Sequence, residues 1–328
     1  MLRGGVFGFG GVGQAKTKQL NEGSGDARIV AVCDVSAEAR RKASSWGGLA
    51  ACSTIDELLA HELDFVLILS TTSAHGTAAK ACLERGIPFL IEKPITLELA
   101  EAERIIRLAR ERNVIHAVNY SMRYRPEFKL MKRMVAQGDI GRPVSLWAHK
   151  SRGHGFYETG ARHPAVVRPD LSGGWLIHHM CHIVDFAIWL LGPVKHVHAV
   201  TTSTAPAAMQ SEEVIGATLV FQNGAVASLF DQVGGIVAEG YGVTGTTGGI
   251  KLAEIAGQPV VHHHAATDAE WGPPRTLDPL KTFSPEDGLS HFLACVREGR
   301  PSDVPLWEAF DSLRVCHALR NAARQTTG

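Results

Sequence analysis

The N-terminal part of the sequence contains a glycine-rich run with the spacing G-x-G-x-x-G, Gly8-Phe9-Gly10-Gly11-Val12-Gly13. An acidic residue, Asp34, follows Gly13 by 21 residues, and a ribose-binding carboxylate is usually found about 20 residues on. Such glycines let the backbone approach a pyrophosphate, the following helix offers N–H donors, and the carboxylate accepts from two ribose hydroxyls. The pattern therefore predicts a dinucleotide site. The alternative is a structural strand–turn–helix corner with a solvated Asp34.

A lysine stands where a short apolar stretch ends, in the sequence Pro88-Phe89-Leu90-Ile91-Glu92-Lys93-Pro94. In doubly wound sheets, ligands lie outside the carboxyl ends of the strands. Lys93 is therefore expected to point toward the dinucleotide, where its ammonium can donate a hydrogen bond to a substrate hydroxyl. The alternative is a surface lysine at the end of a strand.

Histidines cluster in one part of the chain, since six of the 16 lie between His149 and His182. The segment Gly173–Gly192 is apolar nearly all round, which predicts a buried helix. At about 100° per residue, its polar side chains fall within about 60° of one another, with Trp175 and Trp189 on the same stripe. These polar residues are His178, His182 and Asp185. A polar stripe on a buried helix needs partners, and two histidines with an aspartate favour a functional site over histidines satisfied in the core.

The stretch Lys150–Asp170 leads into this helix, and its glycines and prolines predict a loop. It contains Lys150, Arg152, Arg162 and Arg168 against Glu158 and Asp170, a local excess of two positive charges, and also His154 and His163. One interpretation is a solvated loop whose arginines pair with nearby acids or with another subunit. The other is that one or two arginines bind a carboxylate while Tyr157 and Trp175 cover a ring face.

The elements that position these residues change character along the chain. The first ~120 residues alternate apolar runs with helical patterns, which predicts an α/β domain with a parallel sheet. The expected strands are Gly5–Gly8, Ile29–Cys33, Phe65–Leu69, Pro88–Ile91 and Val114–Val118, and the clearest helices are Ala74–Arg85, closed by Gly86, and Leu97–Arg112.

Beyond about Tyr124 the pattern predicts consecutive hairpins, and hence an α+β domain with a mostly antiparallel sheet. Strands are expected at Val144–His149, Val194–Thr202, Ile215–Phe221, Ala225–Phe230 and within Gly240–Leu252. The sequence Gln222-Asn223-Gly224 is a strong hairpin signal. The run His262-His263-His264 is read as ordinary strand, and two helices, Gly288–Glu298 and Leu306–Gln325, close the chain.

Composition excludes several classes of protein. With 328 residues, the chain is about twice the length of one domain, so we expect domains at 1–122 and 123–328, with the last helix packing back on the first. Its 33 basic and 33 acidic residues balance, which argues against a nucleic-acid partner. The longest apolar run, Phe186–Leu191, is far shorter than the ~18 residues of a membrane span. Six cysteines without paired spacing and an N-terminus without a signal-peptide core predict a cytoplasmic protein with reduced thiols.

With these motifs in view, the sequence resembles the glucose–fructose oxidoreductase/inositol dehydrogenase/MocA (Gfo/Idh/MocA) family over nearly its whole length. The glycine run, Asp34 and Glu92-Lys93-Pro94 carry the resemblance in the first domain. The sequence Asn119-Tyr120-Ser121-Met122-Arg123-Tyr124-Arg125-Pro126 is similar to the family's transition between domains. Gly173-Gly174, His182, Asp185 and Leu190-Leu191-Gly192 are similar to its active-site helix.

The resemblance implies an N-terminal Rossmann domain and a C-terminal domain whose large open sheet often forms the interface of a homodimer or homotetramer. It also implies oxidation of a secondary alcohol of a sugar, sugar acid, polyol or cyclic diol with NAD, or less favourably NADP. By position, Lys93 is the catalytic lysine and His182 the catalytic histidine. His178 stands where many members have an aspartate, and a neutral imidazole cannot supply that fixed negative charge.

The candidate site residues form two sets. Those expected to bind the cofactor are Gly8, Phe9, Gly10, Gly11, Val12, Gly13, Asp34, Val35, Ser70, Thr71, His75, Glu92 and Lys93. Those expected to contact a small-molecule substrate are Lys93, Tyr120, Arg123, Arg152, Tyr157, Arg162, Trp175, His178, His179 and His182, with Lys93, His178 and His182 as the catalytic candidates. No metal is expected, although His178 and His182 have a spacing that can chelate zinc.

Three functions remain open from the sequence. In a dehydrogenase, His182 takes the hydroxyl proton, hydride leaves the same carbon for the nicotinamide, and Lys93 polarises the oxygen. In a glycosidase that retains its NAD, the sugar is oxidised transiently, the aglycone is eliminated, water adds and the sugar is reduced again. A non-catalytic NAD-binding sensor or scaffold is the third, and the presence of Lys93 and His182 argues against it.

Asp34 predicts a preference for NAD over NADP, because a 2′-phosphate would meet its negative charge. Val35 and Ser36 follow, and the next arginine is Arg40, so we expect no cation close enough to offset the repulsion. Since about 1.4 kcal/mol is tenfold, kcat/KM for NAD should exceed that for NADP at least about tenfold. Steady-state kinetics with both cofactors tests this preference, and comparable efficiencies would contradict it.

Overall fold

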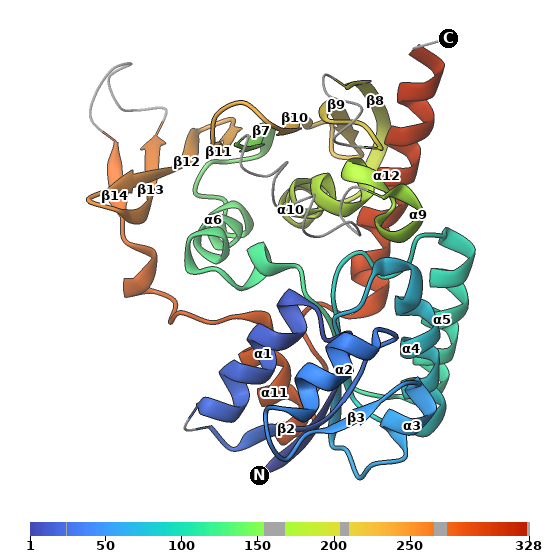
Figure 1. Ribbon diagram of the computed structural model, residues 1–328. Helices are drawn as coiled ribbons and strands as arrows, with labels where there is room; N and C mark the ends of the chain where they lie inside the picture. The colour runs from blue at the N-terminus through green and yellow to red at the C-terminus, as the bar shows by residue number, and fades with distance from the viewer. Residues whose placement is uncertain (24, 154–167, 204–209, 266–273, 327–328) are drawn as a thin grey trace. The chain divides into compact units, whose positions relative to one another are not determined.

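The chain forms two compact units in the computed structural model, which describes residues 1–23, 25–153, 168–203, 210–265 and 274–326 (Figure 1). The first unit comprises Met1–Tyr120 and Gly288–Phe310. The second comprises Ser121–Asp287 and Asp311–Gly328.

The first unit is therefore discontinuous, whereas the sequence predicted a boundary at residue 122, with only the last helix packing back on the first domain. Helix α11 (Gly288–Glu298) belongs to the first unit because Leu289, Phe292 and Leu293 are part of its hydrophobic core. They pack there with apolar residues of five of the six strands of the parallel sheet, among them Phe65. No local sequence pattern marks the point at which a chain leaves one hydrophobic core and enters another. The place of α11 in the core of the first unit is therefore visible only in the packed structure.

The first unit has a six-stranded parallel sheet in the order β3-β2-β1-β4-β5-β6, which confirms the expected Rossmann fold. Its elements are β1 Leu2–Phe7, α1 Gly11–Glu22, β2 Ala27–Cys33, α2 Ala37–Ser44, β3 Ala50–Cys52, α3 Ile55–Leu59, β4 Phe65–Ile68, α4 Thr72–Arg85, β5 Phe89–Ile91, α5 Leu99–Arg112, β6 His116–Val118, α11 and the start of α12 (Leu306–Thr326). The short edge strand β3 was not expected, because it has only three residues and all of them are small.

The order of these strands determines where a ligand can bind. β1 lies between β2 and β4, so the chain order reverses between β1 and β4. In an open α/β sheet, the crevice outside the carboxyl ends of the strands at such a reversal is the usual ligand site. β5 is the next neighbour of β4, so the residues after β1, β4 and β5 lie along the same edge of the sheet.

The second unit has an eight-stranded sheet in the order β14-β13-β12-β11-β7-β10-β9-β8, as expected for a large, mostly antiparallel sheet. Its elements are η1 Ser121–Tyr124, α6 Pro126–Gln137, β7 Pro143–Arg152, α9 Pro169–Ser172, η2 Leu176–Met180, α10 Cys181–Leu191, β8 Val194–Thr202, β9 Val214–Phe221, β10 Val226–Val233, β11 Ala238–Gly245, β12 Gly248–Ile255, β13 Gln258–Ala265, β14 Arg275–Leu277, η3 Pro279–Lys281 and most of α12. The Asn223-Gly224 turn joins β9 to β10 as predicted. Among the described strands of this second sheet, only β7 and β10 pair in parallel.

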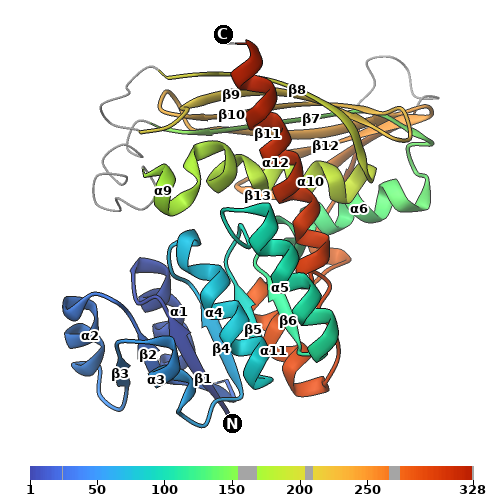
Figure 2. The ribbon, with the colours of Figure 1, turned by 90° about the vertical axis from the view of Figure 1, so that its right-hand side faces the viewer.

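The two faces of this sheet differ in their surroundings. Alternate residues of β9 and β10 are buried, and Figure 2 shows α6, α9 and α10 on one side of the sheet. We call the side that carries these helices the inner face. On the opposite, outer face, large apolar side chains remain partly exposed: Val144, Trp147, Val200, Val226 and Phe230.

Two expectations about the segment before α10 were wrong. The stretch expected to be a loop starts inside a strand, because Lys150, Ser151 and Arg152 pair with β10, and Lys150 and Ser151 also pair with β11. The expected single α-helix begins with one π-helical turn, η2, and only then continues as α10. Its i→i+5 bonds rotate successive residues by less than 100°, so the predicted polar stripe does not persist through the turn. Residues 154–167, with Tyr157 and Arg162, lie outside the described part of the chain.

The stretch Pro169–Leu191 is long and apolar enough, by length and composition alone, to cross a membrane, with a mean hydropathy of 1.3 in its most apolar window. However, 78% of that window is buried inside the protein. Helix α10 packs against β7, β10 and α6, which accounts for its apolar character on all sides. Length and composition therefore give only weak support for a membrane span here.

A buried ion pair ties α10 to the start of the second unit. Asp185 of α10 accepts two hydrogen bonds from Arg123 of η1, from Nε at 2.9 Å and from Nη2 at 2.8 Å. The side chains are only 1% and 5% exposed. The structure thus commits both residues to each other, although Arg123 was expected at the substrate and Asp185 on a stripe with the catalytic histidine.

Replacing Asp185 by alanine should destabilise the second unit, because Arg123 would remain buried without its carboxylate. Removing one partner of a buried pair costs about 3–5 kcal/mol. Urea unfolding followed by tryptophan fluorescence measures this, and the double variant Arg123→Met/Asp185→Leu should recover much of the loss. The matched control is Asp170→Ala, which breaks the exposed pair with Arg168 and should leave the midpoint unchanged. Equal midpoints for the two aspartate variants would contradict the assignment.

Candidate active site

The glycine-rich run forms a tight corner between β1 and α1. Gly8 has a φ of +101°, and a side chain there would come within 2.5 Å of the Ser70 backbone after β4. A side chain on Gly13 would collide with the Gly8 carbonyl oxygen. Gly10, by contrast, has no atom within 4 Å of the position a Cβ would take, and no side chain caps the first turn of α1. An exposed helix N-terminus with bare backbone is the surface that a pyrophosphate requires.

Asp34 is held in place by two backbone amides. Its Oδ2 accepts a hydrogen bond from Phe9 N at 2.7 Å, and its Oδ1 accepts one from Ser36 N at 2.8 Å. The carboxylate therefore joins the glycine corner to the turn after β2, and it remains only partly buried. Val35 beside it is 89% exposed, so its side chain leaves the neighbourhood of the carboxylate open.

One expectation about this turn was wrong, because a cation does lie close to Asp34. Arg40 reaches back from α2, and its Nη1 donates to the carbonyl oxygens of Asp34 and Val35 at 2.8 and 2.9 Å. Helix α2 begins at Ala37, so residue 40 is one turn along and can fold over the preceding residues. Because Nη1 of Arg40 is hydrogen-bonded to these two backbone carbonyls, the predicted preference for NAD over NADP rests on the charge of the Asp34 carboxylate.

The catalytic lysine candidate follows β5, at the same edge of the sheet. Glu92 before it accepts a hydrogen bond from Asn119 Nδ2 at 2.6 Å and lies beside the Lys93 backbone amide, at 3.3 Å. Both Glu92 and Lys93 are half-buried. The structure thus fixes the backbone on either side of Lys93, since Pro94 is also bound, as described next.

His75 of α4 connects the lysine segment to the end of β4. Its Nδ1 lies 2.8 Å from the Pro94 carbonyl oxygen, and its Nε2 lies 3.1 Å from the Ser70 carbonyl oxygen. The ring is fully buried, and burial, together with the nearby Lys93 charge, lowers the pKa of His75 to about 4. Ser70, Thr71 and His75 were expected to bind the cofactor. Ser70 lies beside Gly8 and Thr71 precedes the first residue of α4, while the buried His75 is hydrogen-bonded to the Ser70 carbonyl and helps to position this segment.

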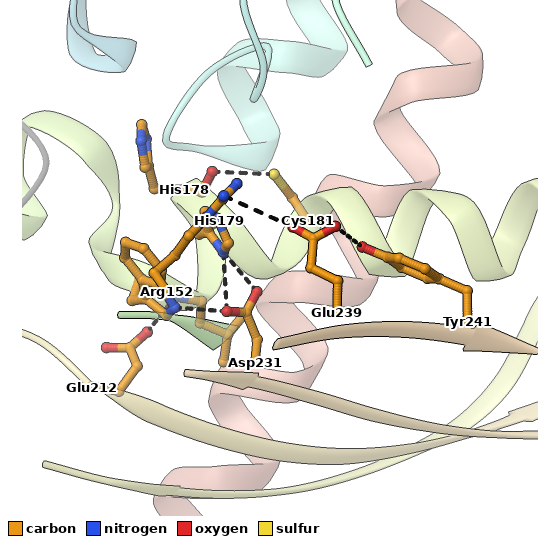
Figure 3. Close-up of polar contacts among 10 residues, drawn as sticks. Arg152, His178, His179, Cys181, Glu212, Asp231, Glu239 and Tyr241 are labelled. Carbon is orange, nitrogen blue, oxygen red and sulfur yellow. Dashed lines mark hydrogen bonds and ion pairs between the residues drawn. The ribbon is translucent and has the colours of Figure 1, made fainter. Parts of the chain in front are cut away.

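Three histidines lie close together at the π-helical turn: His178 and His179 within it, which Figure 3 labels, and His182 just after it in α10. The turn begins where Trp175 N donates to Ser211 Oγ at 3.2 Å and Leu176 N donates to Glu212 Oε1 at 3.0 Å. His178 and His182 are half-buried, whereas His179 is buried and stacks on Trp175 with ring centroids 4.1 Å apart. The His179 and His182 rings meet edge to face at 5.9 Å.

The structure also brings in residues that the sequence analysis missed. Asp231 of β10 accepts hydrogen bonds from the Trp175 and His179 rings, and Glu239 of β11 lies near Arg152. Asp231 could have been found, because the alternation of β10 places it on the buried face with Leu229 and Val233. Of the other expected substrate residues, Tyr120 is buried. Within the described ranges, no group of three His, Cys, Asp or Glu side chains is arranged to hold a metal ion.

A Rossmann sheet with an open glycine corner, followed by an α+β unit with a large sheet, defines a two-domain dinucleotide-binding oxidoreductase. Residues 2–120 match the family model described as "Oxidoreductase family, NAD-binding Rossmann fold", and residues 128–251 match the "GFO/IDH/MocA C-terminal domain". The chain belongs to the Gfo/Idh/MocA family of oxidoreductases. It therefore binds NAD and acts on alcohol groups.

Similar proteins act on sugars and polyols. The chain is 25% identical to the 1,5-anhydro-D-fructose reductase of Ensifer adhaerens over 311 residues, 92% of each chain. It is 27% identical to inositol 2-dehydrogenase 4 of Saccharopolyspora erythraea over 65% of this chain and 62% of that protein. Its fold matches the WlbA dehydrogenase of Bordetella pertussis, solved with NADH and UDP-GlcNAcA, with a TM-score of 0.83, 20% identity and coverage of 99% and 97% of the two chains.

Replacing His75 should change how the stability of the first unit depends on pH. The pKa of His75 is about 4 in the folded protein, below the ~6.5 of an exposed histidine, so between pH 6.5 and 4 only the unfolded state takes up the proton. Stability is therefore present above pH 6.5 and is lost as the pH falls toward 4, by about 3 kcal/mol in total.

In a His75→Gln variant, this part of the acid sensitivity should disappear. Urea unfolding at pH 7 and pH 4.5, with the exposed His196→Ala as control, measures the difference. An unchanged pH dependence in His75→Gln would show that His75 is not buried neutral.

Proposed function

We propose that this chain oxidises a secondary alcohol of a sugar, polyol or cyclic diol, with NAD as the acceptor of hydride. The observation that carries the proposal is the position of Lys93. It follows β5 at the sheet edge where the glycine corner and Asp34 form the dinucleotide cradle, and its neighbours Glu92 and Pro94 are both hydrogen-bonded in place. A fixed ammonium beside a nicotinamide site is suited to polarise the oxygen of the reacting alcohol.

The residues of the cradle fit NAD. The amides at the start of α1 and the bare backbone of Gly10 would hold the pyrophosphate, and Asp34 would accept hydrogen bonds from the adenosine ribose. Bound NAD supplies the hydride acceptor, which no side chain of the protein can replace.

The protein's own chemistry is a proton transfer. His182 would take the hydroxyl proton as general base, since it is half-exposed on the histidine cluster and its imidazole can accept at neutral pH. Lys93 would donate a hydrogen bond to the same oxygen and stabilise the charge that develops there. His178, which stands in place of a carboxylate, would contribute a neutral donor or acceptor next to this base.

The names of similar proteins support this substrate class. They include inositol 2-dehydrogenases, a D-apiose dehydrogenase from Paraburkholderia graminis and a UDP-N-acetylglucosamine 3-dehydrogenase from Acidithiobacillus ferrooxidans. Each acts on a hydroxyl of a polyhydroxylated ring or sugar by its name. No feature of the residues that the structure describes favours the glycosidase that retains its NAD. The two reactions differ in whether NADH accumulates.

We further propose that copies of the chain associate through the outer face of the second sheet. Trp147 and Phe230 are 42% and 36% exposed there, and the Nε2 atom of His149 is buried on that face without a hydrogen-bond partner. Exposed apolar surface of this kind is typical of protein interfaces.

A screen of NAD reduction against sugars, uronates, inositols and cyclic dihydrodiols tests the proposed reaction. NADH should accumulate with at least one neutral polyhydroxylated compound. Lys93→Met and His182→Ala should each lower kcat at least about 100-fold, because each removes a group positioned on the reacting oxygen. NAD binding should survive in both.

Matched controls are Lys80→Met and His196→Ala, which replace exposed residues of the same types. Turnover of a glycoside without net NADH would instead identify the glycosidase, and near-normal kcat in either catalytic variant would refute the assigned roles.

A further inference from the structure

A buried carboxylate organises the polar groups beneath the π-helical turn. Asp231 is 0% exposed on the inner face of β10. Its Oδ1 accepts from Trp175 Nε1 at 2.9 Å, and its Oδ2 accepts from His179 Nδ1 at 2.8 Å. An ionised carboxylate can only accept hydrogen bonds, so the proton of the His179 ring lies on Nδ1.

This hydrogen bond determines what the other side of the ring can do. With the proton on Nδ1, Nε2 of a neutral imidazole is a bare acceptor. Arg152 Nε, which can only donate, lies 3.0 Å from it. A doubly protonated ring would place two donors against each other, so the geometry requires neutral His179. Asp231 and His179 thus hold the Arg152 guanidinium by its Nε and leave its terminal amines for other partners (Figure 3).

The far end of Arg152 faces Glu239 across a short gap. Nη1 lies 3.8 Å from Glu239 Oε1, and the two side chains are 39% and 34% exposed. Tyr241 donates to the other carboxylate oxygen of Glu239 at 3.2 Å, which orients it. A separation of 3.8 Å is too long for a direct hydrogen bond between these atoms.

The gap instead has the dimensions of a bridging hydroxyl. An oxygen about 2.8 Å from both atoms can accept from Nη1 and donate to Oε1, which satisfies both at normal hydrogen-bond lengths. A carboxylate oxygen in the same place has no proton to donate and would meet the charge of Glu239. The pair therefore distinguishes a hydroxyl from a carboxylate.

We propose that Arg152 and Glu239 form a specificity site for a hydroxyl group of an uncharged polyol, and that Asp231 and His179 are positioning residues that hold Arg152 for this purpose. The inference rests on the proposed oxidation of an alcohol, because His179 and the catalytic candidate His182 are in ring contact. The sequence suggested that Arg152 binds a carboxylate, whereas the proposed site prefers a hydroxyl over a carboxylate.

Binding of two matched pairs of probes tests the specificity site. D-glucose and D-glucuronate, and likewise D-galactose and D-galacturonate, differ only in a hydroxymethyl group against a carboxylate. Calorimetry with the NADH-loaded protein should give at least about tenfold tighter binding for the neutral member of a pair. Glu239→Gln should reduce this ratio to about threefold or less, because the amide no longer repels the acid. Arg152→Ala should weaken the neutral sugar at least about tenfold, and Arg275→Ala on the exposed strand β14 should change nothing.

A double-mutant cycle tests the positioning role. In Asp231→Asn, the new amide can donate to Nδ1 of His179, so the ring proton moves to Nε2. Nε2 then becomes a donor that faces the Nε donor of Arg152. In Asp231→Asn, sugar binding should weaken about as much as in Arg152→Ala. The double variant Arg152→Ala/Asp231→Asn should bind the sugar no more weakly than either single variant. The dissociation constant of NADH should stay unchanged. If Asp231→Asn fails to fold, the Arg152 and Glu239 variants still decide the specificity.

Four outcomes would overturn the proposal: tighter binding of the uronates, no binding of any neutral probe, an unchanged ratio in Glu239→Gln, or additive losses in the double variant. Additive losses would leave Asp231 a purely structural residue. Failure of the proposed oxidation is separate, because it appears as no NADH formation while the binding ratios hold.

Discussion

The second unit depends on the cost of removing a carboxylate from water. Asp231 has no exposed surface, and an ionised group in that position is tolerated only when donors surround it. The π-helical turn supplies them, because it brings the Trp175 indole and the His179 ring to the same carboxylate. A regular helix would have turned these side chains by a different amount. The proton position of His179, the direction of Arg152 and the contact of His179 with His182 all follow from that one buried charge.

In the first unit, the buried polar group is a neutral one, which avoids the cost of burying a charge. His75 is buried between two carbonyl oxygens, and its pKa near 4 keeps the ring uncharged close to Lys93. One α4 side chain thereby connects the segment after β4 with the segment after β5. In both units, a buried histidine helps to position a cationic residue, because His75 is hydrogen-bonded to the backbone next to Lys93 and His179 to the side chain of Arg152. Lys93 and Arg152 thus remain partly exposed, while His75 and His179, which help to orient them, are buried.

The sequence predicts the parts of this structure that local chemistry determines. The glycine corner, the Gly86 end of α4 and the Asn223-Gly224 hairpin each need a particular residue at one position, so each is visible in a short window. The family motif around Lys93 is similarly local.

The π turn was not predictable in this way, because it arises where the start of the helix must satisfy Ser211, Glu212 and Asp231, which come from distant segments. Arg123 and Arg152 were expected at the substrate because their charge is visible in the sequence, whereas their pairing with Asp185 and Glu239 is set by packing. Asp231 comes directly after the predicted strand Ala225–Phe230, whereas β10 extends to Val233. Its role depends on which face of β10 is covered.

The discontinuity of the first unit has a consequence for how the protein is made. Residues 1–120 leave the ribosome first, but the helix that completes their core starts at Gly288. At 5–20 residues per second, the missing helix arrives roughly ten to thirty seconds later. During that interval the growing chain carries a sheet whose apolar face is open, while the whole second sheet is still being synthesised. A chain that ends before Gly288 therefore lacks the helix that packs on Phe65, and part of the core of its first unit stays exposed to solvent.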